Sequence, residues 1–188
     1  TVTGVQTCAL PILTSFSPRV AVFAERFPGT GGGIATAHDG LGKLLERNCT
    51  VEYFAFEPCC ERGEARIHRT TGSRLLGTLV AELLSLKVRR HERSGRISAV
   101  RRIGRTAANI RRLVGPLRRF RPDFVILPDD QLPALALTVP ANAKVIWVAH
   151  HNYQRFLEQP FLQPECAYDL FLAHRLERRA AAKCDFAV

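Results

Sequence analysis

The sequence lacks several features that would point directly to a chemistry. It has no methionine and one tryptophan in 188 residues, and its six cysteines form no CxxC pair and no His/Cys spacing typical of a metal site. No Lys-Ser/Thr follows the glycine-rich segment, so there is no Walker A loop, and the absence of G-x-S-x-G argues against a Ser/His/Asp hydrolase. No apolar run approaches the ~18 residues that a membrane span needs. The cysteines indicate reduced thiols in a cytosolic protein.

The composition is that of one globular domain with a buried core, since 46% of the residues are hydrophobic and 23% are charged. The net charge of +10 is concentrated in residues 87–121, which hold thirteen Lys or Arg and a single acid, Glu92. Such a segment is either a solvated face or a surface for an anionic partner. Phe120 is its only aromatic residue, which disfavours nucleic acid because bases need stacking platforms. The other anionic partner that fits such a segment is a membrane surface with negatively charged lipids. The residues assigned to this surface are Arg101, Arg102, Arg105, Arg111 and Arg112.

The first thirteen residues differ in character from the rest. Val2 to Ile12, read as VTGVQTCALPI, resembles the in-frame translation of a common sequencing-library adapter. A secretory signal would need a basic n-region, and no basic residue precedes Arg19. We therefore expect residues 1–13 to be a non-native segment and residues 18–188 to form the domain.

The next part of the chain has the pattern of a βαβ unit. Residues 19–25 form a short apolar run typical of a buried strand, and residues 28–33 form a glycine loop. A helix is expected over residues 34–47, followed by a strand over residues 50–56. The apolar face expected for this helix contains Ile34, Ala37, Leu41, Leu44 and Leu45. A right-handed crossover then implies a parallel sheet.

The same alternation resumes after a helical middle. Leucine spacing predicts a helix over residues 73–88, and a second apolar stripe predicts a helix over about 97–117, with Pro116 kinking its last turn. Strands are expected at 124–127, at 144–149 and from 185 onward, with a helix over about 167–183. The sequence therefore predicts an α/β fold with a doubly wound, Rossmann-like parallel sheet.

Polar residues gather where three of the predicted strands end. The glycine loop holds Gly32 and Gly33, the pair Asp129 and Asp130 follows another strand, and His150-His151 follows a third. In open α/β sheets, ligands bind beyond the carboxyl ends of the strands, and a helix N-terminus after a glycine loop favours an anion. Each feature alone is also compatible with a tight turn or a locally bonded loop histidine. No residue set is spaced for a metal ion.

Taken in order, these segments resemble the N-terminal domain of a GT-B glycosyltransferase of the retaining group called glycosyltransferase family 4. The likeness extends from about Arg19 to Val188. Its pieces are Val20-Ala-Val-Phe-Ala, Pro28 with Gly32-Gly33-Ile34, the helix leucines, Val51-Glu-Tyr-Phe, Arg121-Pro122-Asp123-Phe-Val-Ile, Lys144-Val-Ile-Trp-Val-Ala-His150 and Lys183-Cys-Asp185-Phe-Ala-Val.

The resemblance implies the acceptor-side half of an enzyme that transfers a sugar, with retention, from a nucleotide-diphosphate donor to a glycan or lipid-linked acceptor. Gly32 and Gly33 would lie against the donor, and His150 would be the catalytic contact to the transferred sugar. The acceptor side would involve Asp129, Asp130 and His151, although many relatives carry Asp where His151 stands. The family's nucleotide-holding Glu-x7-Glu pair would lie in a second domain that these 188 residues do not include.

The resemblance further implies no metal and no cofactor besides the donor nucleotide sugar. It also implies a cytoplasmic protein, peripheral to the inner face of the cell membrane, with no nucleic-acid partner. Two alternatives from other classes stay open. One is a non-catalytic α/β module that binds anionic surfaces through its basic segment. The other is a Rossmann-type nucleotide binder, for which Glu57 near the end of the second strand is the expected acid, although the glycine loop matches the dinucleotide fingerprint poorly.

Overall fold

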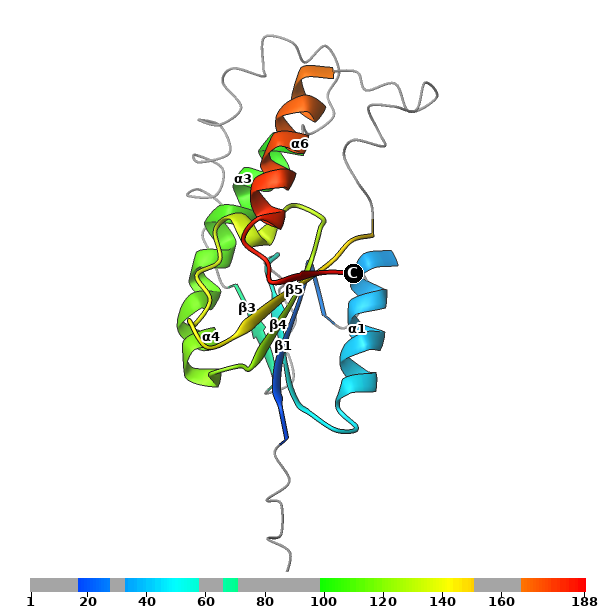
Figure 1. Ribbon diagram of the computed structural model, residues 1–188, viewed down its shortest axis with the longest axis vertical. Coiled ribbons are helices and arrows are strands. Elements are labelled where there is room, and N and C mark those ends of the chain that lie inside the picture. Colours follow the sequence, from blue (N-terminus) through cyan, green and yellow to red (C-terminus); the bar gives the residue numbers. More distant parts are fainter. Residues whose placement is uncertain (1–16, 28–32, 58–65, 71–98, 151–166) are drawn as a thin grey trace, which may run out of the picture.

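The chain forms a single parallel sheet flanked by helices. The computed structural model describes residues 17–27, 33–57, 66–70, 99–150 and 167–188, so the segment 1–13 and the helix expected over 73–88 lie outside the described residues. All five strand pairings are parallel, in the order β3-β2-β1-β4-β5-β6 (Figure 1). The strands are β1 (Arg19–Ala24), β2 (Thr50–Ala55), β3 (Ile67–Arg69), β4 (Phe124–Pro128), β5 (Lys144–Val148) and β6 (Phe186–Ala187). The predicted doubly wound α/β fold is confirmed.

The direction of winding reverses between β1 and β4, which are neighbours at the centre of the sheet. From β1 the chain moves outward to β2 and β3, and from β4 it moves outward the other way to β5 and β6. Right-handed crossovers in opposite directions place their helices on opposite faces. At such a switch point the connections leave a crevice at the carboxyl ends of the strands, where α/β proteins bind ligands.

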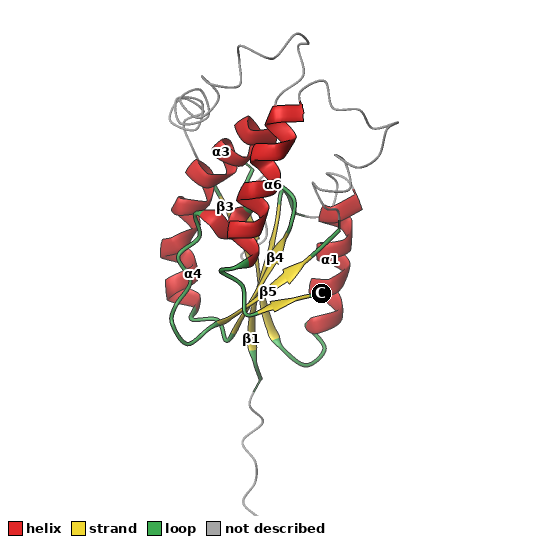
Figure 2. Cartoon of the chain, turned by 45° about the horizontal axis from the view of Figure 1, so that its top comes forward, coloured by secondary structure: helices red, strands yellow, loops and turns green. Residues whose placement is uncertain are grey.

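The helices lie on both faces of the sheet, as Figure 2 shows. Helix α1 (Gly33–Leu45) covers one face. The opposite face carries α3 (Ala99–Ile110), the 3-10 turn η1 (Arg111–Leu113), α4 (Val114–Phe120) and α6 (Ala167–Ala181). Helix α6 packs against α3 and against the short 3-10 turn η2 (Pro133–Leu135).

Two apolar clusters fill the space on the two faces of the sheet, because successive side chains of a strand point to opposite sides. Toward α3 and α4, Phe23 stacks on Phe54 with ring centroids 4.8 Å apart, and Leu127 and Trp147 extend this cluster. The second cluster lies toward α1. Its buried members include Val20, Val22, Val51, Tyr53 and Ile126. Burial on both faces explains why the strands read as continuous apolar runs.

The face that α1 turns to the sheet differs from the expected leucine stripe. Its buried residues are Ala35, His38 and Gly42, whereas Leu44 is 56% exposed. A Cβ atom at position 42 would collide with the ring of Tyr53, so glycine is needed for this close approach. Small residues let the helix axis lie near the sheet, so Leu41 and Leu45 pack against the edges of the contact while Leu44 faces solvent.

The break associated with Pro116 lies one turn earlier than expected. Instead of kinking the last turn of one helix, the chain ends α3 at Ile110, passes through η1 and restarts as α4 at Val114. A proline removes one N–H and its ring clashes with the carbonyl four residues before it, here that of Arg112 within η1. Pro116 instead lies in the first turn of α4, where backbone N–H groups have no partner within the helix, so its missing N–H loses no hydrogen bond.

Aspartates at the starts of two strands fasten neighbouring strands together. Asp123 precedes β4, and its carboxylate accepts the backbone N–H of Arg19 at 2.8 Å. Asp185 precedes β6 and accepts the backbone N–H of Val145 at 2.9 Å, while its other oxygen pairs with Lys144 Nζ at 2.8 Å. The lysine and the backbone N–H hold the pKa of Asp185 below its usual value. Both aspartates therefore act as structural clamps at the amino end of the sheet.

Candidate functional site

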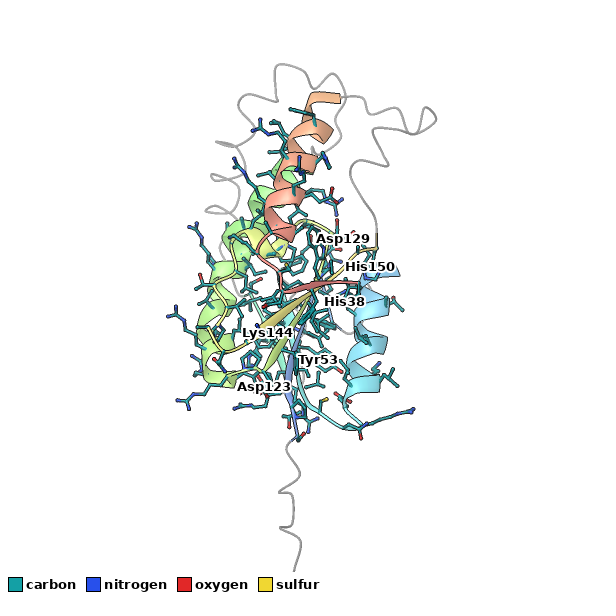
Figure 3. The ribbon with its side chains drawn as sticks, in the orientation of Figure 1. His38, Tyr53, Asp123, Asp129, Lys144 and His150 are labelled. Atoms are coloured by element: carbon teal, nitrogen blue, oxygen red, sulfur yellow. The ribbon has the colours of Figure 1, made fainter. Side chains whose placement is uncertain are left out.

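The candidate site lies at the carboxyl end of the sheet. Figure 3 shows Asp129, His150 and His38 together at this end, with Asp123 and Lys144 toward the opposite one. Asp129 directly follows β4, and His150 comes two residues after β5. The expected convergence of strand ends thus holds for the β4 and β5 positions.

His150 meets a second histidine that the sequence did not single out. Its Nε2 atom lies 3.1 Å from Nε2 of His38, which projects from the buried face of α1. The residue His38 is 1% exposed, whereas His150 is exposed. Burial, followed by the proximity of His150, lowers the pKa of His38 to about 4. His38 is therefore neutral at pH 7, and one of the two rings donates to the other.

Asp129 fixes the backbone that carries His150. Its Oδ2 atom accepts the backbone N–H of His150 at 3.0 Å, and its own N–H donates to the carbonyl of Val148 at 3.2 Å. The Asp129 residue is 2% exposed. Its carboxylate thus ties the end of β4 to the end of β5. The role expected for Asp129 as an acceptor-facing group remains a prediction.

Asp130 belongs to a separate buried network that reaches α3. Its Oδ2 atom accepts a hydrogen bond from Gln131 Nε2 at 3.2 Å and lies 3.4 Å from Arg102 Nη2. Gln131 in turn accepts from the Thr106 hydroxyl at 2.6 Å. Arg102, which the sequence assigned to the basic surface, is half exposed and pairs with Asp130 at the rim of the site.

The backbone after Asp130 is strained. Gln131 and Leu132 both have positive φ, 56° and 50°, in the left-handed region that side chains with a Cβ rarely occupy. Each such residue costs on the order of 1–3 kcal/mol. Both are almost fully buried, so the Thr106–Gln131–Asp130 hydrogen bonds and the surrounding core hold the turn in place.

Two acidic residues lie at the carboxyl ends of β1 and β2, beside the position where the direction of winding reverses. Glu25 follows β1 directly, and its backbone carbonyl accepts the N–H of Glu57 at 3.0 Å. Burial, together with the neighbouring carboxylates of Glu57 and Asp130, raises the pKa of Glu25 to about 7. The Glu57 side chain pairs with Arg26 at 2.8 Å. Glu25 can therefore hold or release a proton near neutral pH.

The other predicted residues fall in different places. Gly33 begins α1 and is exposed, and apart from its chain neighbours and its own helix no described atom lies within 4 Å of where a Cβ would be; Gly32 and His151 lie outside the described residues. Arg105 is partly buried, Arg111 and Arg112 are exposed, and the side chain of Arg101 lies outside the description. The segment 99–120 contains no acid, so the exposed side of η1 and α4 is strongly basic.

Sequence reasoning did not assign His38, Glu25, Thr106 or Gln131 to the site. A signal existed for His38, which lies three residues after Ala35 and four before Gly42, the helical spacing of a buried face. The leucines of α1 obscured it. Glu25 is the first residue past a buried strand, the same position that drew attention to Asp129. Thr106 and Gln131 carry no local signal, because their partnership exists only across 25 residues of chain.

Comparison with known proteins adds no relative to this description. A scan against protein-family models, a search of curated proteins and a search of solved structures each found no match. Within the described ranges, none of the helices combines the length and apolarity that crossing a bilayer requires. The described part of the chain also contains no group of three or more His, Cys, Asp or Glu arranged to hold a metal ion.

Proposed function

We propose that this chain is the acceptor-side domain of a retaining glycosyltransferase of the GT-B type. The observation that carries the proposal is the placement of His150. It follows β5 at the carboxyl edge of a sheet with the order β3-β2-β1-β4-β5-β6, its backbone is fixed by Asp129, and its ring meets His38. The order and spacing of the segments that resemble family 4 support the same function.

In the proposed reaction, the bond between the anomeric carbon of the donor sugar and the oxygen of its nucleoside diphosphate breaks. A hydroxyl oxygen of the acceptor forms the new bond, and its proton leaves with the diphosphate. The part played by this domain is positioning and electrostatics. His150 contacts the sugar, Gly32 and Gly33 let the donor approach the backbone closely, and Asp129, Asp130 and His151 border the acceptor. In the family that these segments resemble, the residues that bind the nucleotide belong to a second domain.

Turnover and binding assays on the chain as it stands test this proposal. We expect no release of nucleoside diphosphate from a panel of nucleotide sugars, because the Glu-x7-Glu pair that holds the nucleotide in the family is not among these 188 residues. We expect simple saccharides to shift the NMR signals of His150 and Gly33, and to shift Gly33 less in His150→Ala. Robust turnover that depends on His150 would overturn the half-enzyme proposal.

A Rossmann-type nucleotide binder is the second candidate, and two observations favour it. The strand order is that of dinucleotide-binding domains, and Glu57 stands just beyond β2, where such proteins bind the ribose. Against it, the Glu57 carboxylate already pairs with Arg26 at 2.8 Å. Titration with NAD, ATP and UDP separates the two candidates. Binding of a free nucleotide that is lost in Glu57→Gln and kept in His150→Ala would favour the nucleotide binder.

A further inference from the structure

The hydrogen bonds around Asp130 form a chain in which every donor can be assigned. A carboxylate can only accept, so the Gln131 atom that faces Asp130 Oδ2 at 3.2 Å is the amide Nε2. The amide oxygen of Gln131 therefore faces the Thr106 hydroxyl, which donates to it at 2.6 Å. Arg102 Nη2 lies 3.4 Å from the same oxygen of Asp130. All the donors in this chain therefore point toward Asp130.

The inner part of this chain is held firmly in place. Thr106, Asp130 and Gln131 are all buried. Gln131 has a positive φ of 56°, and such a backbone conformation persists only where the surrounding structure over-determines it. Thr106 and Arg102 both lie on α3, one turn apart, so the turn after β4 is tied to this helix at two points. Asp130 therefore has a fixed position from which it can orient Arg102.

Arg102 is the member of the chain that reaches solvent. Its side chain is 47% exposed, whereas that of Asp130 is 12% exposed. A guanidinium carries five N–H donors in a planar fork, and Asp130 is its one hydrogen-bond partner among the described residues. The remaining donors can therefore bond to a ligand at the rim of the site.

The place of Arg102 in its helix also favours an anion. Helix α3 begins at Ala99 and has no acid in its first turn, although the positive end of the helix dipole lies there. A cation in that turn is unfavourable unless negative groups face it, and Asp130 is one such group. Two further acids, Glu25 and Glu57, follow the neighbouring strands β1 and β2. Because the pKa of Glu25 is raised to about 7, this carboxyl is largely neutral in mildly acidic solution and repels an anion little.

We propose that Arg102 binds a phosphate group of the substrate, and that Thr106 and Gln131 are positioning residues that hold Asp130 behind it. A guanidinium fixed by a carboxylate can bind a phosphate through two parallel N–H···O bonds, which an unoriented surface arginine does less well. The inference rests on the proposed function only for the source of the phosphate, which is either a phosphorylated acceptor or the diphosphate of the donor. It assigns Arg102 to the site and not to the basic surface.

Titration of the 188-residue chain with inorganic phosphate, followed by NMR at about pH 6.5 and constant ionic strength, tests the binding site. We expect Arg102→Gln to raise the Kd for phosphate about tenfold, the usual loss for a hydrogen-bonded charge. Arg111→Gln is the matched control, because it removes an exposed arginine of η1, and should leave the Kd unchanged. Arg102→Lys keeps the charge but lacks the planar fork, so it should recover only part of the binding.

The positioning role has its own comparison. Thr106→Val removes the hydroxyl while nearly keeping the size of the side chain, so Gln131 and Asp130 lose their fixed orientation. We expect phosphate binding to weaken about threefold, whereas Thr106→Ser keeps the donor and should bind like the native chain. In the native chain the Arg102 Nε–H should give a sharp, slowly exchanging signal. A merely structural role of Thr106 would lower stability and leave the Kd of the folded protein unchanged.

The outcomes separate the inference from the proposed function. Absence of phosphate binding, or an equal loss in Arg102→Gln and Arg111→Gln, would overturn the anion site. Unchanged binding in folded Thr106→Val would overturn the positioning role. If that variant fails to fold, the Arg102 Nε–H signal of the native chain decides, and rapid exchange would count against the role.

Two further probes identify the source of the phosphate. Tighter binding of glucose 6-phosphate than of UDP would place it on the acceptor, and the reverse order would place it on the donor. If phosphate binds through Arg102 but neutral saccharides leave the signals of His150 and Gly33 unchanged, the anion site holds and the glycosyltransferase proposal fails.

Discussion

The two ends of the sheet use polar residues in different ways. At the amino end, the carboxylates of Asp123 and Asp185 each accept a backbone N–H from a neighbouring strand, and the side-chain bonds of each reach that one strand. At the carboxyl end, side chains from two helices and from the segments that follow β4 and β5 bond to each other. His38 meets His150, and Thr106 meets Gln131. Bonds to a single neighbouring strand hold the strands together, whereas a network that joins several elements positions side chains.

This difference bears on how the resemblance should be interpreted. The segments Arg121-Pro-Asp123 and Lys183-Cys-Asp185 are among the pieces that resemble family 4, and the structure gives them a role in strand pairing. A carboxylate placed just before a strand satisfies an N–H that the adjacent strand leaves open at its start. These two motifs therefore support the fold only. Support for a function has to come from the residues at the carboxyl end of the sheet.

Substitution at the carboxyl end should affect activity far more than stability. In a full-length enzyme of the proposed type, we expect His150→Ala to lower kcat by about 100-fold, because under the proposed function the ring contacts the sugar in the transition state. Thermal unfolding should change less than kcat, since His150 is itself exposed and the structural loss is its hydrogen bond to the buried His38. The matched variant His151→Ala should lower kcat less. Steady-state kinetics of both variants measure this, and a larger effect at His151 would show that the assignment is wrong by one residue.

The buried groups of the carboxyl end should give the domain two opposing pH dependences. The pKa of His38 is lowered from 6.5 to about 4, so the unfolded chain binds more protons in this window. Stability from His38 is therefore present above pH 6.5 and lost toward pH 4, by about 3 kcal/mol. The pKa of Glu25 is raised from 4.5 to about 7, so the folded chain binds more protons there. Stability from Glu25 is present below pH 4.5 and lost as pH rises to 7.

Single variants should separate these two contributions in urea unfolding measured from pH 4 to pH 8. Glu25→Gln leaves the His38 contribution, so stability should fall on acidification below pH 6.5. His38→Gln leaves the Glu25 contribution, so stability should rise on acidification below pH 7. The groups that set the Glu25 value are Glu57, Asp130 and Arg102, and those facing His38 are His150 and Asp129. If stability changed with pH in the same direction in both variants, the contributions assigned to His38 and Glu25 would be wrong.

At the amino end the expected effect is smaller and purely structural. Asp123→Ala leaves the N–H of Arg19 without its carboxylate and should lower the free energy of unfolding by about 1–2 kcal/mol. Asp123→Asn keeps an acceptor oxygen and should recover part of this loss. Neither variant should change the signals of the histidine rings at the other end. Chemical denaturation and the histidine NMR spectrum together test this, and a change of those signals in Asp123→Ala would show that the ends are coupled.

The smallest effect concerns the basic surface, of which Arg102 also reaches the rim of the site. We expect weak, salt-sensitive binding to anionic vesicles and little binding to zwitterionic ones, because exposed charges act together within a Debye length of ~8–10 Å. A five-fold change to Gln should abolish binding without unfolding the domain. The residues are Arg101, Arg102, Arg105, Arg111 and Arg112.

Co-sedimentation with vesicles at low and high salt measures this binding. Arg102→Gln alone is an informative control, because Arg102 pairs with Asp130 and so belongs partly to the site. It should reduce vesicle binding only slightly. Absence of binding at low salt, or binding unchanged in the five-fold variant, would identify the arginines as an ordinary solvated face.

Much of the fold was predictable from the sequence because its strands are buried on both faces. Five of the six strands appear as apolar runs with turn signals, and β1, β2, β4 and β5 agree with the expected bounds within one or two residues. The three-residue strand β3 was not predicted, since three residues are too few to show a period. The buried face of α1 was predicted in part: Leu41 and Leu45 pack against the core, but Leu44 is exposed, and the close approach at Gly42 places small residues at the centre of the contact.

The sequence by itself determined the class of the fold and the end of the sheet at which to look, because apolar periodicity and strand-end residues are local properties. Only the tertiary structure decided what those residues do. The tertiary structure buries Asp129 and Asp130, pairs Arg102 with Asp130 at the rim of the site, and places the buried His38 against His150. The physical reason is that such pairs form between residues distant in sequence, His38 and His150 being 112 positions apart, and their distances are set by how α1, β4 and β5 pack together.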